Sequence, residues 1–86
     1  MNINELIAIV KNKLGGKIVI QDLKIEDKSF LHKNHKGHQE GKFHLKLIIK
    51  SEELAKTSKI VSTKKIYSVL DLELKEHIHS IQILLN

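Results

Sequence analysis

Residues 42–50, KFHLKLIIK, decide the fold, because their side chains alternate between apolar and polar in the pattern of a β-strand with one buried face. The apolar face carries Phe43, Leu45, Leu47 and Ile49. The opposite face carries His44, Lys46, Ile48 and Lys50. We therefore predict a half-buried strand at 42–50 and interpret His44 as a surface residue.

The segment before this strand combines a helical pattern with a second strand. Apolar residues recur at helical spacing over residues 2–14, and Asn2 with Glu5 resembles a capping pair. We expect Gly15 and Gly16 to end this helix in a left-handed conformation, because glycine tolerates it. Residues 17–25 are rich in β-branched side chains and predict a strand, and the polar residues 26–42 predict a long loop.

The segment after the central strand predicts helices and a closing strand. Ser51 followed by two glutamates indicates a capped helical turn near Leu54. A longer helix is predicted over 61–76, with an apolar stripe formed by Ile66, Val69, Leu70 and Leu74. Its water-facing side is expected to carry Lys64, Lys65, Asp71, Glu73 and Lys75. Residues 78–85 predict a last strand, with His79, Ile81, Ile83 and Leu85 on one face.

This order of elements predicts an α+β fold, α-β-β-α-α-β, in a single domain spanning residues 1–86. We expect a three-stranded mixed sheet with its helices on one face. The preference for right-handed crossovers places the last strand parallel to the second.

The composition excludes several classes of function. The 86 residues contain no apolar run long enough to cross a bilayer and no signal peptide, which predicts a cytoplasmic protein without a membrane partner. Cysteine is absent, so histidine and carboxylate are the remaining strong metal donors. Signatures of hydrolases and transferases are missing, which indicates a binding protein and not an enzyme, and no small-molecule substrate is inferred.

The net charge of +5 comes from 15 lysines without any arginine, which allows attraction to phosphates but disfavours base-specific recognition. The alternative is that the lysines only solvate the surface.

The six histidines are the chemically notable feature. Three of them, His32, His35 and His38, repeat every third residue in the predicted loop. His77 lies at a predicted helix end, where the helix dipole favours a cation. His79 begins the apolar face of the last strand, so we expect packing to fix its ring and make it the better metal ligand.

The sequence resembles the BolA family in the order and spacing of several segments. The resemblance rests on Asp27 to Ser29, His35-Lys36-Gly37-His38, Phe43 to Glu52, Ile66-Tyr67 and Ile78-His79-Ser80-Ile81. Two departures are notable: the family's Arg-His-Arg falls on Ser62-Thr63-Lys64, and its Ala after the last-strand histidine falls on Ser80.

The resemblance implies a fold similar to type II KH domains and a partnership with monothiol glutaredoxins around a shared two-iron two-sulfur (2Fe-2S) cluster. Imidazole can replace thiolate on one iron of such a cluster, whereas this chain alone has no thiolates and is expected to hold none when isolated. By the resemblance, His79 is the fixed ligand and His35 the loop ligand, with His38 or His32 as substitutes.

Two other functions stay open. The first is a transcriptional regulator that binds DNA through a helical face with Lys59, Lys64 and Lys65. The loss of the family's two arginines weakens this reading. The second is binding of zinc by the loop histidines without a partner.

Overall fold

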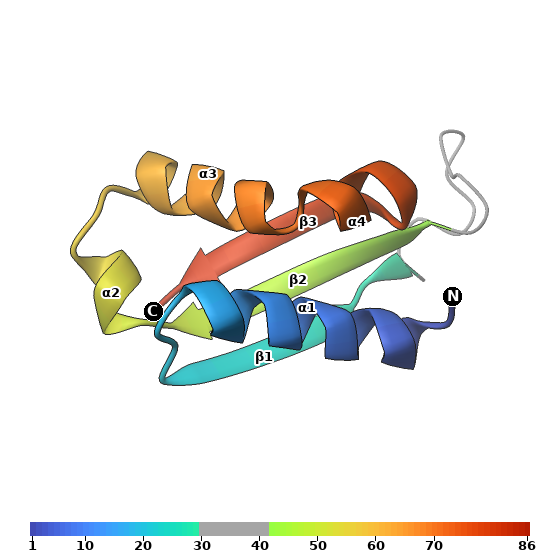
Figure 1. Cartoon of the computed structure of the whole chain (residues 1–86), viewed down its shortest axis with the longest axis horizontal. Helices are drawn as coiled ribbons and strands as arrows, with labels where there is room; N and C mark the ends of the chain where they lie inside the picture. Colours follow the sequence, from blue (N-terminus) through green and yellow to red (C-terminus); the bar gives the residue numbers. More distant parts are fainter. Residues whose placement is uncertain (30–41) are drawn as a thin grey trace.

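The computed structural model describes residues 1–29 and 42–86, which form a three-stranded sheet covered by helices. The strands lie in the order β1-β2-β3, with β1 antiparallel and β3 parallel to the central β2. Figure 1 shows α1 and the α3–α4 pair on the same side of this sheet. The predicted α+β class, the mixed sheet and the parallel last strand are confirmed.

The central strand β2, Phe43–Lys50, agrees with the prediction and supplies the middle of the core. Leu45, Leu47 and Ile49 are buried beneath the helices. Leu47 pairs with Ile25 of β1, Asp22–Asp27, and with Ile83 of β3, Ile78–Leu85. The alternating pattern predicts this strand well because the helices cover one face of the sheet, so that alternate side chains of β2 enter the core.

Helix α1, Ile3–Lys17, begins as predicted, with the side chain of Asn2 accepting a hydrogen bond from the Glu5 N–H at 2.9 Å. The predicted end at Gly15 and Gly16 is wrong. Neither glycine has a left-handed backbone, and the helix continues until the Ile18 N–H donates to the Leu14 carbonyl. Buried Leu14 and Ile18 flank the last turn, so packing outweighs the cost of about 1 kcal/mol per helical glycine. The predicted strand at 17–25 consequently begins later, at Asp22.

The second helical region contains three helices: α2, Glu52–Ala55; α3, Lys59–Val69; and α4, Asp71–Glu76. The predicted turn is confirmed, because Ser51 accepts a hydrogen bond from the Leu54 N–H. The single helix predicted over 61–76 is wrong, since the backbone leaves helical geometry at Leu70, whose side chain is fully buried. The break allows α4 to pack against β3. Within residues 1–29 and 42–86, no helix has the length and apolarity that a bilayer span requires.

Glu73 of α4 was predicted to face water but is buried, with 4% of its surface exposed. Its Oε2 lies 2.6 Å from Lys13 Nζ of α1, sixty residues away in the sequence. Its Oε1 has no hydrogen-bond partner among the described residues. The ion pair therefore joins α1 to α4, and it is the charge that makes the burial of this carboxylate tolerable.

We expect the Lys13→Met variant to lose about 2 kcal/mol of unfolding free energy, because it leaves a buried carboxylate without its charge partner. This is below the usual cost of breaking a fully buried pair, since 38% of the Lys13 side chain is exposed. Urea denaturation measures the effect. The matched control is Lys11→Met on the exposed side of the same helix, and equal losses in both variants would contradict the assignment.

Strand β3 has the predicted bounds but carries an irregularity at its start. Phe43 pairs with Ile78, whereas the next residue of β2, His44, pairs with Ser80. One residue of β3, His79, is therefore extra in the ladder, which reverses the alternation of faces. Ile81, Ile83 and Leu85 pack against the core as predicted, but the placement of His79 on that face is wrong.

Candidate functional site

His44 is the anchor of a polar cluster at the end of the sheet where β2 begins. Only 5% of its surface is exposed, so its interpretation as a surface residue is wrong. Its N–H donates to Ser29 Oγ at 3.0 Å, and its carbonyl accepts from the Lys28 N–H at 2.7 Å. Ser29 is held in turn by its own N–H, which donates to Asp27 Oδ1. The backbone of His44 is thus tied to the residues that follow β1.

The ring of His44 contacts two residues of β3. Its Nδ1 lies 2.7 Å from Ser80 Oγ, and its Nε2 lies 3.2 Å from Nδ1 of His79. The two imidazole rings meet edge to face, with centroids 4.7 Å apart and planes inclined by 65°. His79 itself is exposed. The extra residue in β3 places Ser80 opposite His44 and brings the His79 ring against it.

Two proton arrangements satisfy these contacts. In the first, His44 Nδ1–H donates to Ser80 Oγ and His79 Nδ1–H donates to His44 Nε2, which leaves a lone pair on His79 Nε2. In the second, both bonds run in the opposite direction and His79 Nε2 carries the proton. Only the first arrangement presents a ligand nitrogen. It is also the pattern usual for metal-binding histidines, which donate their other ring N–H to a fixed partner.

The described residues contribute too few donors to enclose a metal ion. Among residues 1–29 and 42–86, no group of three histidine or carboxylate side chains gathers at one point. Asp27, the carboxylate connected to the cluster, accepts the hydrogen bond from Ser29. The arrangement can therefore supply one oriented and exposed imidazole, while further ligands must come from elsewhere.

Of the predicted ligands, the structure describes His79 but not the loop histidines. His79 is exposed and contacts the His44 ring, and its position comes from the irregularity of β3 and not from apolar packing. The loop histidines, His32, His35 and His38, lie outside the described residues. His44 and Ser80 were missed as site residues. The sequence carried a signal for neither, because their contact depends on the pairing register of two strands.

The three lysines proposed for nucleic-acid binding all lie on α3, but their neighbours differ. Lys65 Nζ is 2.6 Å from Glu53 Oε2, and this hydrogen bond, together with one from the Val19 N–H, lowers the pKa of Glu53. Lys59 and Lys64 instead border a shallow hollow on the outer side of α3, with the exposed apolar residues Ile60 and Tyr67. The basic surface on α3 is thus reduced to two lysines beside an apolar patch.

The matches to known proteins all give the same family. The family model described as BolA-like protein matches residues 14–86. The structure is similar to the BolA domain of SufE1 from Arabidopsis thaliana, with 26% identity, a TM-score of 0.77 and coverage of 100% of this chain and 93% of that one. It is also similar to BolA1 from Arabidopsis thaliana, with 24% identity, a TM-score of 0.77 and coverage of 92% and 87%.

The fold is further shared with BolA1 from Mus musculus, at 18% identity and a TM-score of 0.71, over 90% of this chain and 60% of that one. A search of curated proteins finds no match.

Proposed function

Because the chain belongs to the BolA-like protein family, we propose that it is a non-enzymatic adaptor that binds a monothiol glutaredoxin and supplies His79 to a shared 2Fe-2S cluster. The observation that carries this proposal is the exposed His79 imidazole, whose Nδ1 is engaged by His44. A ligand must combine accessibility with a fixed orientation, and His79 has both.

The chemistry of the donors fits such a cluster. The chain has no cysteine, so the thiolates must belong to the partner, and a histidine nitrogen can take the place of a thiolate on one iron. His79 Nε2 would be that nitrogen, with His35 or His38 as the second histidine of this chain. His44 and Ser80 do not touch the iron in this scheme. Their role would be to hold His79 in the first proton arrangement, which leaves a lone pair on Nε2.

Nucleic-acid binding has weaker support. Lys65 is paired with Glu53, and the remaining lysines, Lys59 and Lys64, border apolar side chains and not a continuous basic surface. Cluster coordination, in contrast, is supported by a defined pair of histidines and by the family.

The proposal is tested by mixing the chain with a cluster-loaded monothiol glutaredoxin and recording visible absorption and circular dichroism. We expect a new spectrum at one equivalent, because replacement of a thiolate by imidazole changes the electronic environment of one iron. The two proteins should also co-elute in size-exclusion chromatography. An unchanged spectrum together with separate elution would contradict the proposal. The control is the cluster-free glutaredoxin, which reports binding of the protein alone.

A further inference from the structure

The two edges of the sheet differ in how well they resist the addition of another strand. The outer strand β1 carries charges at Asp22, Lys24, Glu26 and Asp27, and Lys24 pairs with Glu26 at 3.7 Å. The other outer strand, β3, spans eight residues without an aspartate, glutamate, lysine or proline. Charged residues and prolines are the usual protection of an edge strand. The β3 edge lacks them.

The backbone of β3 has a row of groups that point away from the sheet. The Asn86 N–H donates to the Ile49 carbonyl of β2 at 2.9 Å, so the even-numbered residues at this end of β3 bond to β2. By the alternation of a strand, the N–H and C=O groups of Ile81, Ile83 and Leu85 point outward. Tyr67 Oη donates to the Ile81 carbonyl at 3.5 Å, which is consistent with this direction. That bond is long and comes from a half-exposed side chain, so it protects the edge only weakly against pairing with another strand.

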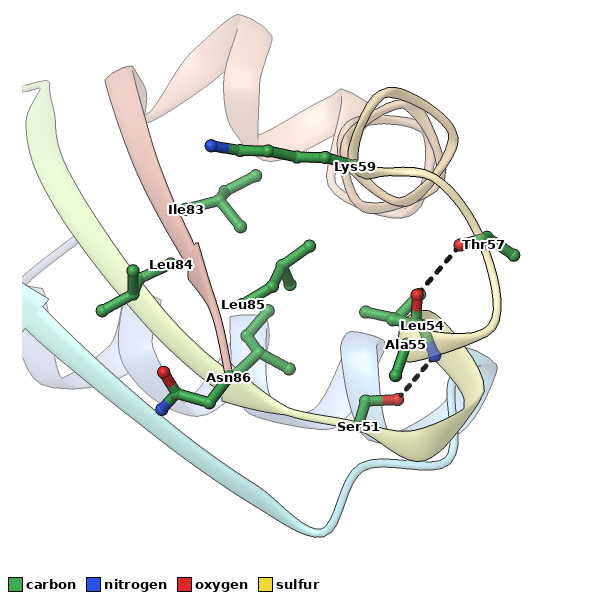
Figure 2. Close-up of a pocket in the computed structure, with 10 residues that line it drawn as sticks. Ser51, Leu54, Ala55, Thr57, Lys59, Ile83, Leu84, Leu85 and Asn86 are labelled. Atoms are coloured by element: carbon green, nitrogen blue, oxygen red, sulfur yellow. Dashed lines mark hydrogen bonds between the residues drawn. The ribbon is translucent and has the colours of Figure 1, made fainter.

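A pocket of about 320 Å³ lies beside the same row, between the second half of β3 and the α2–α3 connection. Its apolar walls include Leu54, Ile83 and Leu85. Lys59 lines this pocket, and Figure 2 shows its side chain stretching from α3 over Ile83, with the ammonium group at the end away from the helix. Lys59 forms no ion pair with any residue of the described part of the chain.

We propose that the β3 edge receives an extended, acidic segment of a partner protein as a fourth strand. The backbone of the segment would bond to Ile81, Ile83 and Leu85, one apolar side chain would enter the pocket, and a carboxylate would meet Lys59. The pocket end of β3 is about 20 Å from His79 along the strand. The pocket is therefore separate from the histidine cluster, whereas the backbone ladder begins at Ile81, two residues after His79. The proposal does not depend on cluster binding.

A second copy of this chain is a poorer occupant of the edge. Figure 1 shows α3 running along β3 on the helical side of the sheet, and Tyr67 reaches from α3 to the edge itself. A second copy joined through its own β3 would bring a second α3, with Lys59 and Lys64, to the same place. Each copy also carries a net charge of +5. An extended acidic segment brings no helix and has the complementary charge.

The proposal is tested with a capped hexapeptide that has valine at every second position and threonine or glutamate at the positions between. Binding of the peptide is followed by amide hydrogen exchange of the protein, measured with NMR. We expect the peptide to slow exchange at Ile81, Ile83 and Leu85 by about tenfold or more, while Gln82 and Leu84, which already bond to β2, change little. The same peptide with alternate amides N-methylated keeps its side chains but cannot form the ladder, so it should give no slowing. Lys59→Glu should weaken binding roughly fivefold, whereas Lys11→Glu should leave it unchanged.

Three outcomes would overturn the proposal. The first is the absence of slowing at millimolar peptide. The second is equal slowing by the N-methylated peptide, because binding would then not use the edge. The third is protection of the three outward amides in the absence of peptide, if this protection increases with protein concentration and sedimentation gives a doubled mass. A second copy would then occupy the edge.

Discussion

The His79→Ala variant is expected to lose the spectral change that the wild-type chain produces on a cluster-loaded monothiol glutaredoxin. The variant removes the one exposed imidazole that the described residues hold in place, and alanine offers no donor atom. The spectral change should be strongly reduced at one equivalent, because the chain has no cysteine to take the place of His79. The measurement is the visible absorption and circular dichroism of the mixture.

The matched control is His77→Ala, two residues earlier in the sequence. His77 ends α4 and lies 3.8 Å from Glu76, outside the contact between His44 and His79. It should keep the wild-type spectrum. A retained spectrum in His79→Ala, or an equal loss in both variants, would remove His79 from the proposed ligand set.

The His44→Phe variant is expected to weaken cluster coordination by His79 roughly 10- to 100-fold, the usual effect of removing the partner that orients a metal-binding histidine. Phenylalanine fills the buried position but cannot accept the proton of His79 Nδ1 at 3.2 Å. The His79 ring would then rotate freely and exchange its tautomers in water. Titration of the chain into the loaded glutaredoxin, followed by the same spectrum, gives the apparent affinity.

Two further variants separate orientation from folding. His44→Gln retains an amide oxygen that can accept the His79 proton, so it should recover much of the affinity that the phenylalanine variant loses. Ser80→Ala removes the partner of His44 Nδ1 and should have an intermediate effect, since the hydroxyl stabilises the proton arrangement only indirectly. If all three variants had the wild-type affinity, His44 would have no role in positioning His79.

The main helices and strands were predicted well from the sequence, but several of their ends were not. The strands at 42–50 and 78–85, the start of α1 at Asn2 and the cap at Ser51 were predicted within one residue, because each depends on side chains that are close in sequence. The ends that were wrong, at Gly15-Gly16 and at Leu70, depend on packing instead. Leu14, Ile18 and Leu70 are buried by other elements, and these contacts override the local preference of the backbone.

The candidate site was predicted in part. His79 was singled out from the resemblance and from its place at the start of a strand, but the reason given for its fixed position was wrong. The extra residue in β3 turns it out of the core face and against His44, which lies 35 residues earlier. No periodicity in either strand reports their mutual register, so neither the contact of His44 with His79 nor the role of Ser80 could be read from the sequence.

Local spacing and composition are enough to predict the strands, most of the helical segments, the apolar faces that form the core, and the lack of any thiolate. The tertiary structure alone decided the burial of Glu73 against Lys13, the burial of His44 and the orientation of His79. Each of these depends on contacts between residues 35 to 60 positions apart, and such contacts exist only after the helices have packed on the sheet and the strands have paired.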